Sequence, residues 1–179
     1  MARGRLAFGL ALLAASAWGQ TVYLGAGVGA VWERHAPVAP GKEWFHSDRT
    51  GESAFLALPV EEGTAFRVER VDLPRDVRWG GGRWEARLAG WTAGIDYFLP
   101  GVWGKALVAG GLGAYRLDLA ARTPPEGLED TRFGWYLKVG EWFSVTRRLT
   151  FAAEVAYHRT NHRGQPQLLT ASGLLVLKF

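Results

Sequence analysis

The sequence predicts an all-β protein, an eight-stranded antiparallel up-and-down transmembrane β-barrel. Three observations carry this prediction. Beyond a hydrophobic leader, apolar residues recur with a period of two and not 3.6. Most alternating segments reach about nine residues, the length that a tilted strand needs to cross a bilayer. The connections between them alternate between short turns and long polar loops, as in a barrel whose two ends face different compartments.

The leader, residues 1–19, has the anatomy of a secretory signal peptide. Arg3 and Arg5 form its basic start, an apolar run covers residues 6–15, and small residues precede the expected cleavage site. This apolar run is too short to cross a bilayer as a helix. We therefore expect export from the cytosol and a mature barrel domain over residues 20–179.

Composition excludes several classes of function. The chain carries a net charge of +4, which falls to +2 once the two arginines of the leader are removed. Because the remaining charges of both signs are interleaved, we expect no nucleic-acid partner. The absence of Cys excludes disulfides and thiolate metal sites, and we find no motif for a metal or a cofactor.

Five segments alternate cleanly and are expected to be strands: residues 22–34, 105–119, 132–145, 149–160 and 168–179. In each we assign the more apolar row to lipid and the row of small or polar residues to the lumen. In the first segment this assignment turns Gly25, Gly27 and Gly29 inward, where opposite walls approach closely. In 105–119 it turns the row from Leu107 to Leu119 toward lipid.

Three further strands are expected in the middle of the chain, over residues 53–60, 65–73 and 83–98. Their phase is uncertain. In the last of them Trp91 falls on the same row as Arg83 and Arg87. Either a bulge near Gly90 or a large ring inside the barrel would account for this.

Aromatic residues on the apolar rows form two belts, as expected at the two interfaces of a membrane barrel. One belt, toward the long loops, contains Trp32, Trp84, Phe133, Trp135, Tyr115 and Tyr157; the other contains Phe98, Phe143 and Phe179. A soluble barrel with an aromatic core is the alternative.

Eight strands enclose a lumen that side chains fill. The charges that alternation places there are Glu33, Arg67, Glu69, Arg116, Asp118, Arg132, Lys138, Glu154 and Lys178. Because buried charges persist only when paired, we expect an ion-pair network that plugs the barrel.

With these features the chain resembles the small outer-membrane β-barrel families of Gram-negative-type bacteria, the eight-stranded OmpA- and OmpW-like group. The resemblance implies an outer-membrane location, contact with membrane lipid and a monomer. It also implies that the last strand, with Leu175, Leu177 and Phe179 on one row, is the signal read by the barrel-assembly machinery.

One stretch, His158-Arg-Thr-Asn, resembles the His-x-Ser-Asn motif of the lipid A 3-O-deacylase family. That resemblance implies His158 as a general base and Thr160 as a nucleophile. In that family, however, a Glu follows the motif, whereas this chain has no acidic residue after Glu154. We therefore favour a structural or binding barrel without a catalytic site. The alternatives are a lipid A-modifying hydrolase and a soluble periplasmic barrel that binds an apolar ligand.

Overall fold

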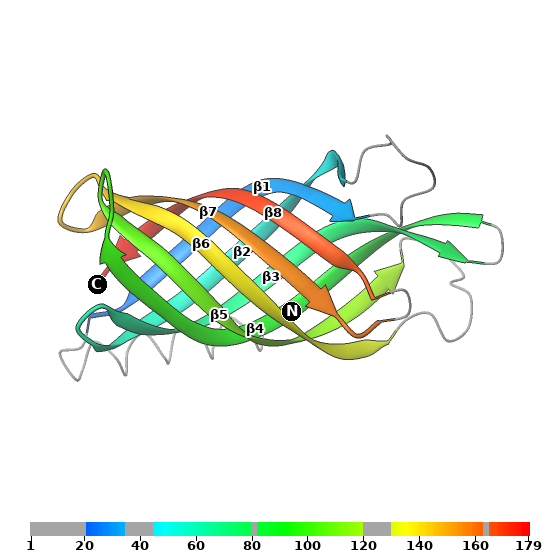
Figure 1. The fold of residues 1–179 in the computed structure, drawn as a ribbon, viewed down its shortest axis with the longest axis horizontal. Helices are drawn as coiled ribbons and strands as arrows, with labels where there is room; N and C mark the ends of the chain where they lie inside the picture. The colour runs from blue at the N-terminus through cyan, green and yellow to red at the C-terminus, as the bar shows by residue number, and fades with distance from the viewer. Residues whose placement is uncertain (1–20, 35–44, 80–81, 120–129, 163–164) are drawn as a thin grey trace.

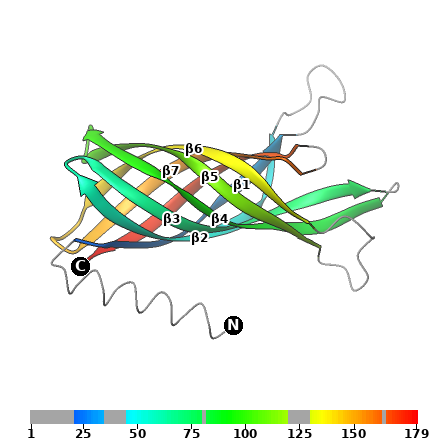
Figure 2. The same cartoon turned by 90° about the horizontal axis from the view of Figure 1, so that it is seen from below.

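A computed structural model describes residues 21–34, 45–79, 82–119, 130–162 and 165–179, so the leader lies outside the described residues. The described chain forms a closed barrel of eight antiparallel strands in sequence order (Figures 1 and 2). The predicted fold class is therefore confirmed. In these same residues no helix is both long and apolar enough to cross a membrane.

The strands are β1 (Tyr23–Arg34), β2 (Phe45–Glu61), β3 (Thr64–Trp79), β4 (Gly82–Pro100), β5 (Lys105–Leu119), β6 (Thr131–Ser144), β7 (Leu149–Thr160) and β8 (Gln167–Lys178). β1 pairs with β8 over eleven residue pairs, from Tyr23↔Lys178 to Glu33↔Leu168, and this pairing closes the barrel. Closure leaves no open edge among the eight strands.

β2 and β3 are longer than the alternation predicted. β2 begins at residue 45 and not at 53, and β3 continues to residue 79, so the hairpin of β3 and β4 extends furthest at the long-loop end (Figure 1). Pro59 and Pro74 both lie inside these strands. The ladder of β2 and β3 shifts register just after Pro59, where a proline nitrogen has no hydrogen to donate.

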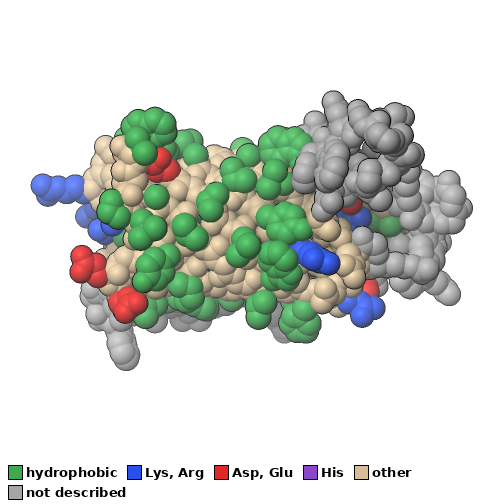
Figure 3. All heavy atoms as spheres, viewed as in Figure 1, with side chains coloured by type: hydrophobic (Ala, Val, Ile, Leu, Met, Phe, Trp, Pro, Cys, Tyr) green, Lys and Arg blue, Asp and Glu red, His purple; other side chains and the backbone are tan. Residues whose placement is uncertain are grey.

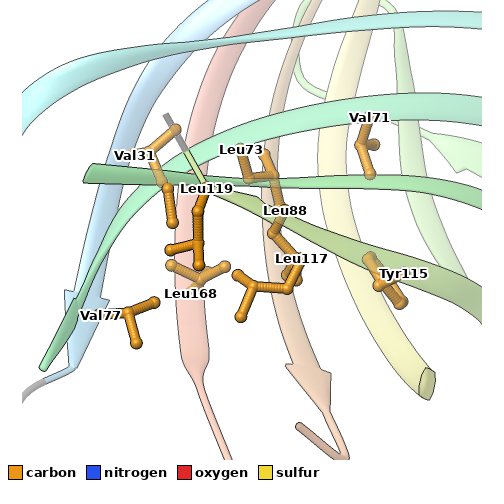
Figure 4. Packing of buried hydrophobic residues seen from close by; sticks show 10 residues of the cluster. Val31, Val71, Leu73, Val77, Leu88, Tyr115, Leu117, Leu119 and Leu168 are labelled. Atoms are coloured by element: carbon orange, nitrogen blue, oxygen red, sulfur yellow. The ribbon is translucent and has the colours of Figure 1, made fainter. Parts of the chain in front are cut away.

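Two apolar clusters fill the lumen, one toward each end. The cluster toward the long loops consists of Val31, Val71, Leu73, Val77, Ala86, Leu88, Tyr115, Leu117, Leu119 and Leu168 (Figure 4). The cluster toward the short turns consists of Phe55, Ala57, Ala65, Leu107, Ala109, Trp142, Ala152, Leu174 and Val176. The interior is therefore packed as a core at both ends.

The β1 glycines face the lumen, as the alternation predicted, but Gly27 and Gly29 are packed against the neighbouring strand β8 and not against an opposite wall. A Cβ built on Gly29 would lie 2.3 Å from the carbonyl oxygen of Ala171, and one on Gly27 would lie 2.3 Å from that of Gly173. Both approaches are too close for any side chain. The row is therefore kept to glycine by the contact between β1 and β8.

The phase predicted for β5 is wrong. Leu107, Tyr115 and Leu117 are buried in the lumen, whereas Val108 and Leu112 face outward. Both rows of this strand hold apolar residues, because the lumen is filled with apolar clusters. Alternation on one strand therefore identified the two rows but not which of them faces lipid.

Neither explanation of the β4 pattern holds: there is no bulge near Gly90, and the ring of Trp91 lies outside the barrel, 52 % exposed. The register of β4 with β5 runs without a shift from Ala86↔Leu119 to Pro100↔Lys105. Trp91 and Arg87 share the outward row because that row passes from the apolar belt into the solvent-facing hairpin at the long-loop end. In consequence Trp84 and Phe98 pack against the lumen clusters and do not join the outer belts.

Five rings of the two predicted aromatic belts lie on the outer wall. Phe133, Trp135 and Tyr157 are outward toward the long loops, and Phe143 and Phe179 toward the short turns. On the wall facing the viewer in Figure 3, hydrophobic side chains are spread along the barrel and most charged side chains lie toward its ends. This is the distribution of an apolar belt between two polar rims.

Candidate functional site

A layer of charged side chains crosses the lumen between the two apolar clusters. Its members are Arg67 and Glu69 on β3, Asp96 on β4, Lys138 on β6 and Glu154 on β7, and each is at most 4 % exposed. They come from strands on opposite sides of the barrel. Alternation places them inward, so their side chains meet near the axis.

Arg67 is the centre of this layer. Its Nη1 and Nη2 atoms donate to the two carboxylate oxygens of Glu154, each at 3.0 Å, and its Nε atom donates to Asp96 Oδ2 at 2.7 Å. The paired bonds to Glu154 have the bidentate geometry that fits a guanidinium to a carboxylate. The face of the guanidinium also lies 3.9 Å from the centre of the Phe55 ring. Arg67 thus joins β3 to β7 across the lumen.

Lys138 completes the layer from the opposite wall. Its Nζ atom donates to Glu69 at 2.7 Å and lies 2.9 Å from Glu154. Trp142 Nε1 donates to Glu154 at 3.0 Å, so that carboxylate is held by three different side chains. Removing one partner of such a network leaves a buried charge uncompensated, which costs about 3–5 kcal/mol. The layer therefore ties β3, β4, β6 and β7 together across the lumen.

The space beside the layer is small. A cavity of about 20 Å³ lies next to Glu69, Lys138 and His158. That is about the room that one water molecule needs. A cavity of this size is too small for a hydrated ion to pass.

His158 faces the lumen and is bonded there. Its Nδ1 atom lies 3.0 Å from the hydroxyl of Tyr115, and its ring stacks on Tyr136 at a centroid distance of 6.0 Å. Thr160, the nucleophile implied by the deacylase resemblance, bonds to a different histidine. The structure therefore does not bring His158 and Thr160 together as a catalytic pair.

Thr160, His162 and Asp130 form a hydrogen-bonded chain at the mouth of the barrel. Thr160 Oγ1 lies 2.9 Å from His162 Nδ1, and His162 Nε2 lies 3.3 Å from Asp130 Oδ1 and 3.2 Å from the Asp130 carbonyl oxygen. Because Nε2 faces only acceptors, it carries the proton and Nδ1 accepts from the hydroxyl. Burial lowers the pKa of His162. The Thr160 side chain is fully buried, so this chain of bonds ties two loops together and presents no accessible nucleophile.

The other predicted lumen charges lie outside the layer, at the mouth, on the outer wall or at the two ends of the barrel. Glu33 lies at the mouth and accepts from Arg75 Nη2 at 2.7 Å. Arg116 and Asp118 face outward, pair with each other at 2.6 Å and are 64 % and 43 % exposed, so their assignment to the lumen is wrong. Arg116 and Asp118 can lie on the outer wall because they are at the long-loop end of β5, where solvent is accessible. Arg132 pairs with Asp130 at the rim, and Lys178 is exposed at the short-turn end.

The terminal row is placed as the alternation predicted. Leu175, Leu177 and Phe179 face outward and are exposed. The backbone of Phe179 exchanges two hydrogen bonds with Val22, at 2.9 and 3.1 Å. The proposed role of this row in assembly stays a prediction.

Asp96 is the member of the layer that the sequence did not reveal. The uncertain phase of β4 hid it, because a carboxyl on the same strand as Glu85 and Arg87 gives no sign of which face it occupies. Its alternation with Trp91, Ile95 and Tyr97 was the available signal: three large apolar residues on one row place Asp96 on the other. Arg75 was missed because β3 was expected to end before it.

No family model and no curated protein matches this chain. Among solved structures it is similar to Neisserial surface protein A, with a TM-score of 0.67 and 12 % identity over 88 % of this chain and 97 % of that one. The fold is that of the small outer-membrane β-barrels.

Two further structures support this assignment of the fold. The attachment invasion locus protein of Yersinia pestis has a TM-score of 0.60 and 10 % identity, over 89 % of this chain and 99 % of its own. A major outer membrane protein from Thermus thermophilus has a TM-score of 0.59 and 10 % identity, over 88 % of this chain and 99 % of its own. At such identities the likeness concerns the fold and carries no residue role.

Proposed function

We propose that this chain resides in the outer membrane of a Gram-negative-type bacterium as a structural or binding barrel with a closed lumen. The observation that carries the proposal is the combination of an apolar outer belt with a charged layer that crosses the interior. A soluble barrel would bury its apolar rows and expose its charges. Here Leu112, Leu137 and Val139 are more than half exposed, whereas Arg67 and Glu154 are buried.

The closed lumen argues against a diffusion pore and for a role of the surfaces outside it. Apolar clusters and the charged layer fill the barrel along its length. The longest projection is the hairpin of β3 and β4 at the long-loop end. A binding role would use this end, where the loops face the exterior in the outer-membrane barrels that share the plan.

Fractionation of cells tests the membrane location. We expect the chain to be recovered with outer membranes and to need detergent for release. We also expect it to migrate differently on a gel before and after boiling, because a closed barrel resists unfolding by the detergent of the gel. Recovery in the soluble periplasm without detergent would instead support a soluble barrel.

The export and assembly signals complete the proposal. We propose that residues 1–19 are cleaved on export and that the barrel-assembly machinery reads the row ending in Phe179. Deletion of Phe179 is expected to lower the amount of folded protein in the outer membrane several-fold, more than it lowers the stability of the folded barrel. Substitution of the neighbouring Lys178 by Ala is the matched control. Equal amounts of the truncated and intact proteins would contradict the assembly role.

The hydrolase alternative has a direct test. Mass spectra of lipid A from cells with and without the protein are expected to show the same acyl chains. A loss of one acyl chain that depends on Thr160 would favour the hydrolase.

A further inference from the structure

Two charged side chains stand on the outer wall within its apolar belt, Glu52 on β2 and Arg70 on β3. Both are exposed and project away from the lumen. Directly opposite Arg70 lie Ala54 on β2 and Trp91 on β4, and directly opposite Glu52 lie Val28 on β1 and Asp72 on β3. The surroundings of Arg70 on the wall are therefore apolar on both sides.

The register fixes the depth of these two residues. Strands of such barrels are tilted by about 35–45°, so directly opposite residues lie at different depths. Following the register around the closed barrel, a residue on β2 lies about one residue closer to the short turns than its partner on β3. Of the outward residues on β2, Glu52 is therefore the one most nearly level with Arg70. Followed further around the barrel, the register places Leu137 on β6 at about the same depth as Arg70. Leu137 lies in the middle of the outward apolar row of β6.

Within one copy Glu52 is the diagonal neighbour of Arg70 on the outer wall, yet the two do not pair in the structure. Among the described residues no hydrogen bond or ion pair involves Glu52 or Arg70, whereas Asp72 pairs with Arg87 at 3.2 Å. A Lys or Arg side chain on the lipid face costs about 2–4 kcal/mol near the bilayer midplane, and an acidic side chain costs less. The two charges have opposite signs and nearly equal depths. A second copy of the same surface can therefore offer each charge a partner of opposite sign.

We propose that the outer faces of β2 and β3 form a two-fold interface between two copies of this chain, with the axis along the membrane normal. Such an axis, placed between β2 and β3, sets each outward residue of β2 against the outward residue of β3 at its own depth on the second copy. Four complementary pairs result, each occurring twice: Thr50 with Asp72, Glu52 with Arg70, Ala54 with Val68, and Leu56 with Phe66. The pairing joins hydroxyl to acid, acid to base and apolar to apolar, as a self-complementary surface requires.

The shape of the neighbouring wall permits the approach. Next to β2 the outer surface is hollowed by about 740 Å³, where the lining includes Ala26, Val28, Ala54 and Gly173. Small residues let the backbones of membrane proteins come close. On the opposite wall Trp135 and Leu137 project instead. The hollow therefore favours this side of the barrel for the interface, and the monomer implied by the family resemblance is replaced by a dimer in this proposal.

Distances between spin labels in lipid vesicles test the interface, on protein already shown to be inserted and heat-modifiable. The chain has no Cys, so Ala54→Cys and Leu137→Cys each provide a single labelling site. These positions lie on opposite walls at similar depth. A dimer through β2 and β3 gives a short distance for Ala54→Cys and one longer by roughly the width of both barrels for Leu137→Cys. No dipolar signal at either site, or the shorter distance at Leu137→Cys, overturns the proposal.

Charge reversal identifies the pair that holds the dimer. Glu52→Arg places like charges opposite each other in both symmetry-related contacts, which lie at the same depth on either side of the axis, and Arg70→Glu does the same with acids. Each variant alone is expected to lose the short distance at the label on residue 54. A one-to-one mixture of the two variants restores opposite charges at both contacts and is expected to restore that distance. Dimers that persist in the single variants, or a mixture that stays monomeric while both variants fold, overturn the proposal.

Discussion

Arg67 and Arg70 lie three residues apart on β3 and face opposite sides of the same wall. Arg67 points inward, is fully buried and donates to Glu154 and Asp96. Arg70 points outward, is exposed and has no partner among the described residues. The alternation of a strand thus puts one arginine into a satisfied network and the other onto a surface that would face lipid.

The comparison shows that the effect of a charge on stability depends on which side of the barrel wall its side chain faces. In the lumen, carboxylates from β4 and β7 meet the guanidinium at hydrogen-bond distance, and the charges hold the strands together. On the outer wall, lipid offers nothing comparable, and in our proposal the partner of Arg70 comes from a second copy. Variants of the two arginines therefore have opposite expected effects.

The largest effect is expected inside. Arg67→Leu leaves Glu154 and Asp96 buried without their principal partner, so the free energy of unfolding should fall by about 3–5 kcal/mol. Urea titration of the reconstituted barrel, followed by the heat-modifiable band, measures it. The matched control adds Glu154→Leu to the same chain, which removes the stranded charge and should recover part of the loss. An unchanged unfolding midpoint for Arg67→Leu would show that the layer does not hold the barrel together.

A smaller effect of opposite sign is expected outside. At a protein-to-lipid ratio low enough to keep barrels apart, Arg70→Leu should raise the free energy of unfolding by about 2–4 kcal/mol, because it removes a charge from the lipid face. The same titration measures it. Val68→Leu, on the same outward row, is the control and should change little. Destabilisation by Arg70→Leu under these conditions would place Arg70 in water and shorten the apolar belt on this side.

The smallest effect is expected at the rim of the barrel, where water competes with the protein for hydrogen bonds. The folded pKa of His162 is lowered by burial, so the unfolded chain takes up its proton first as the pH falls. The bonds to Thr160 and Asp130 should be intact above about pH 6.5 and be lost progressively below it. The imidazole signals in an NMR titration should show a midpoint below that of a free histidine. His162→Asn is the control, and a midpoint above about 6.5 would contradict this reading of the rim.

The fold was readable from the sequence because membrane strands carry a long and regular signal. β6 and β7 alternate mainly between large apolar and small or polar residues, and their faces were assigned correctly. The face of β8 was also assigned correctly, although its inward row holds Leu168, Leu174 and Val176. β5 was inverted because its inward Leu107 and Leu117 are as apolar as its outward Val108 and Leu112. A single strand cannot resolve such a choice, since the deciding contacts come from β4 and β6.

The candidate site was only partly readable for the same reason. Lys138 and Glu154 stand on clean strands and were placed in the lumen. Asp96 was hidden by the uncertain phase of β4, and the pairing of Arg67 with Glu154 joins residues far apart in the sequence. The bond between Thr160 and His162 was also beyond sequence reasoning, because it depends on how the loop after β7 folds back toward Asp130.

The central claim is a membrane barrel whose lumen is closed by the layer around Arg67. The conductance of the purified protein in a planar lipid bilayer tests it most directly. The account predicts no steady conductance for the intact chain, and none for Glu154→Ala, which removes the carboxylate shared by Arg67, Lys138 and Trp142 but leaves the apolar clusters on both sides of the layer. A steady conductance of the intact protein would contradict it.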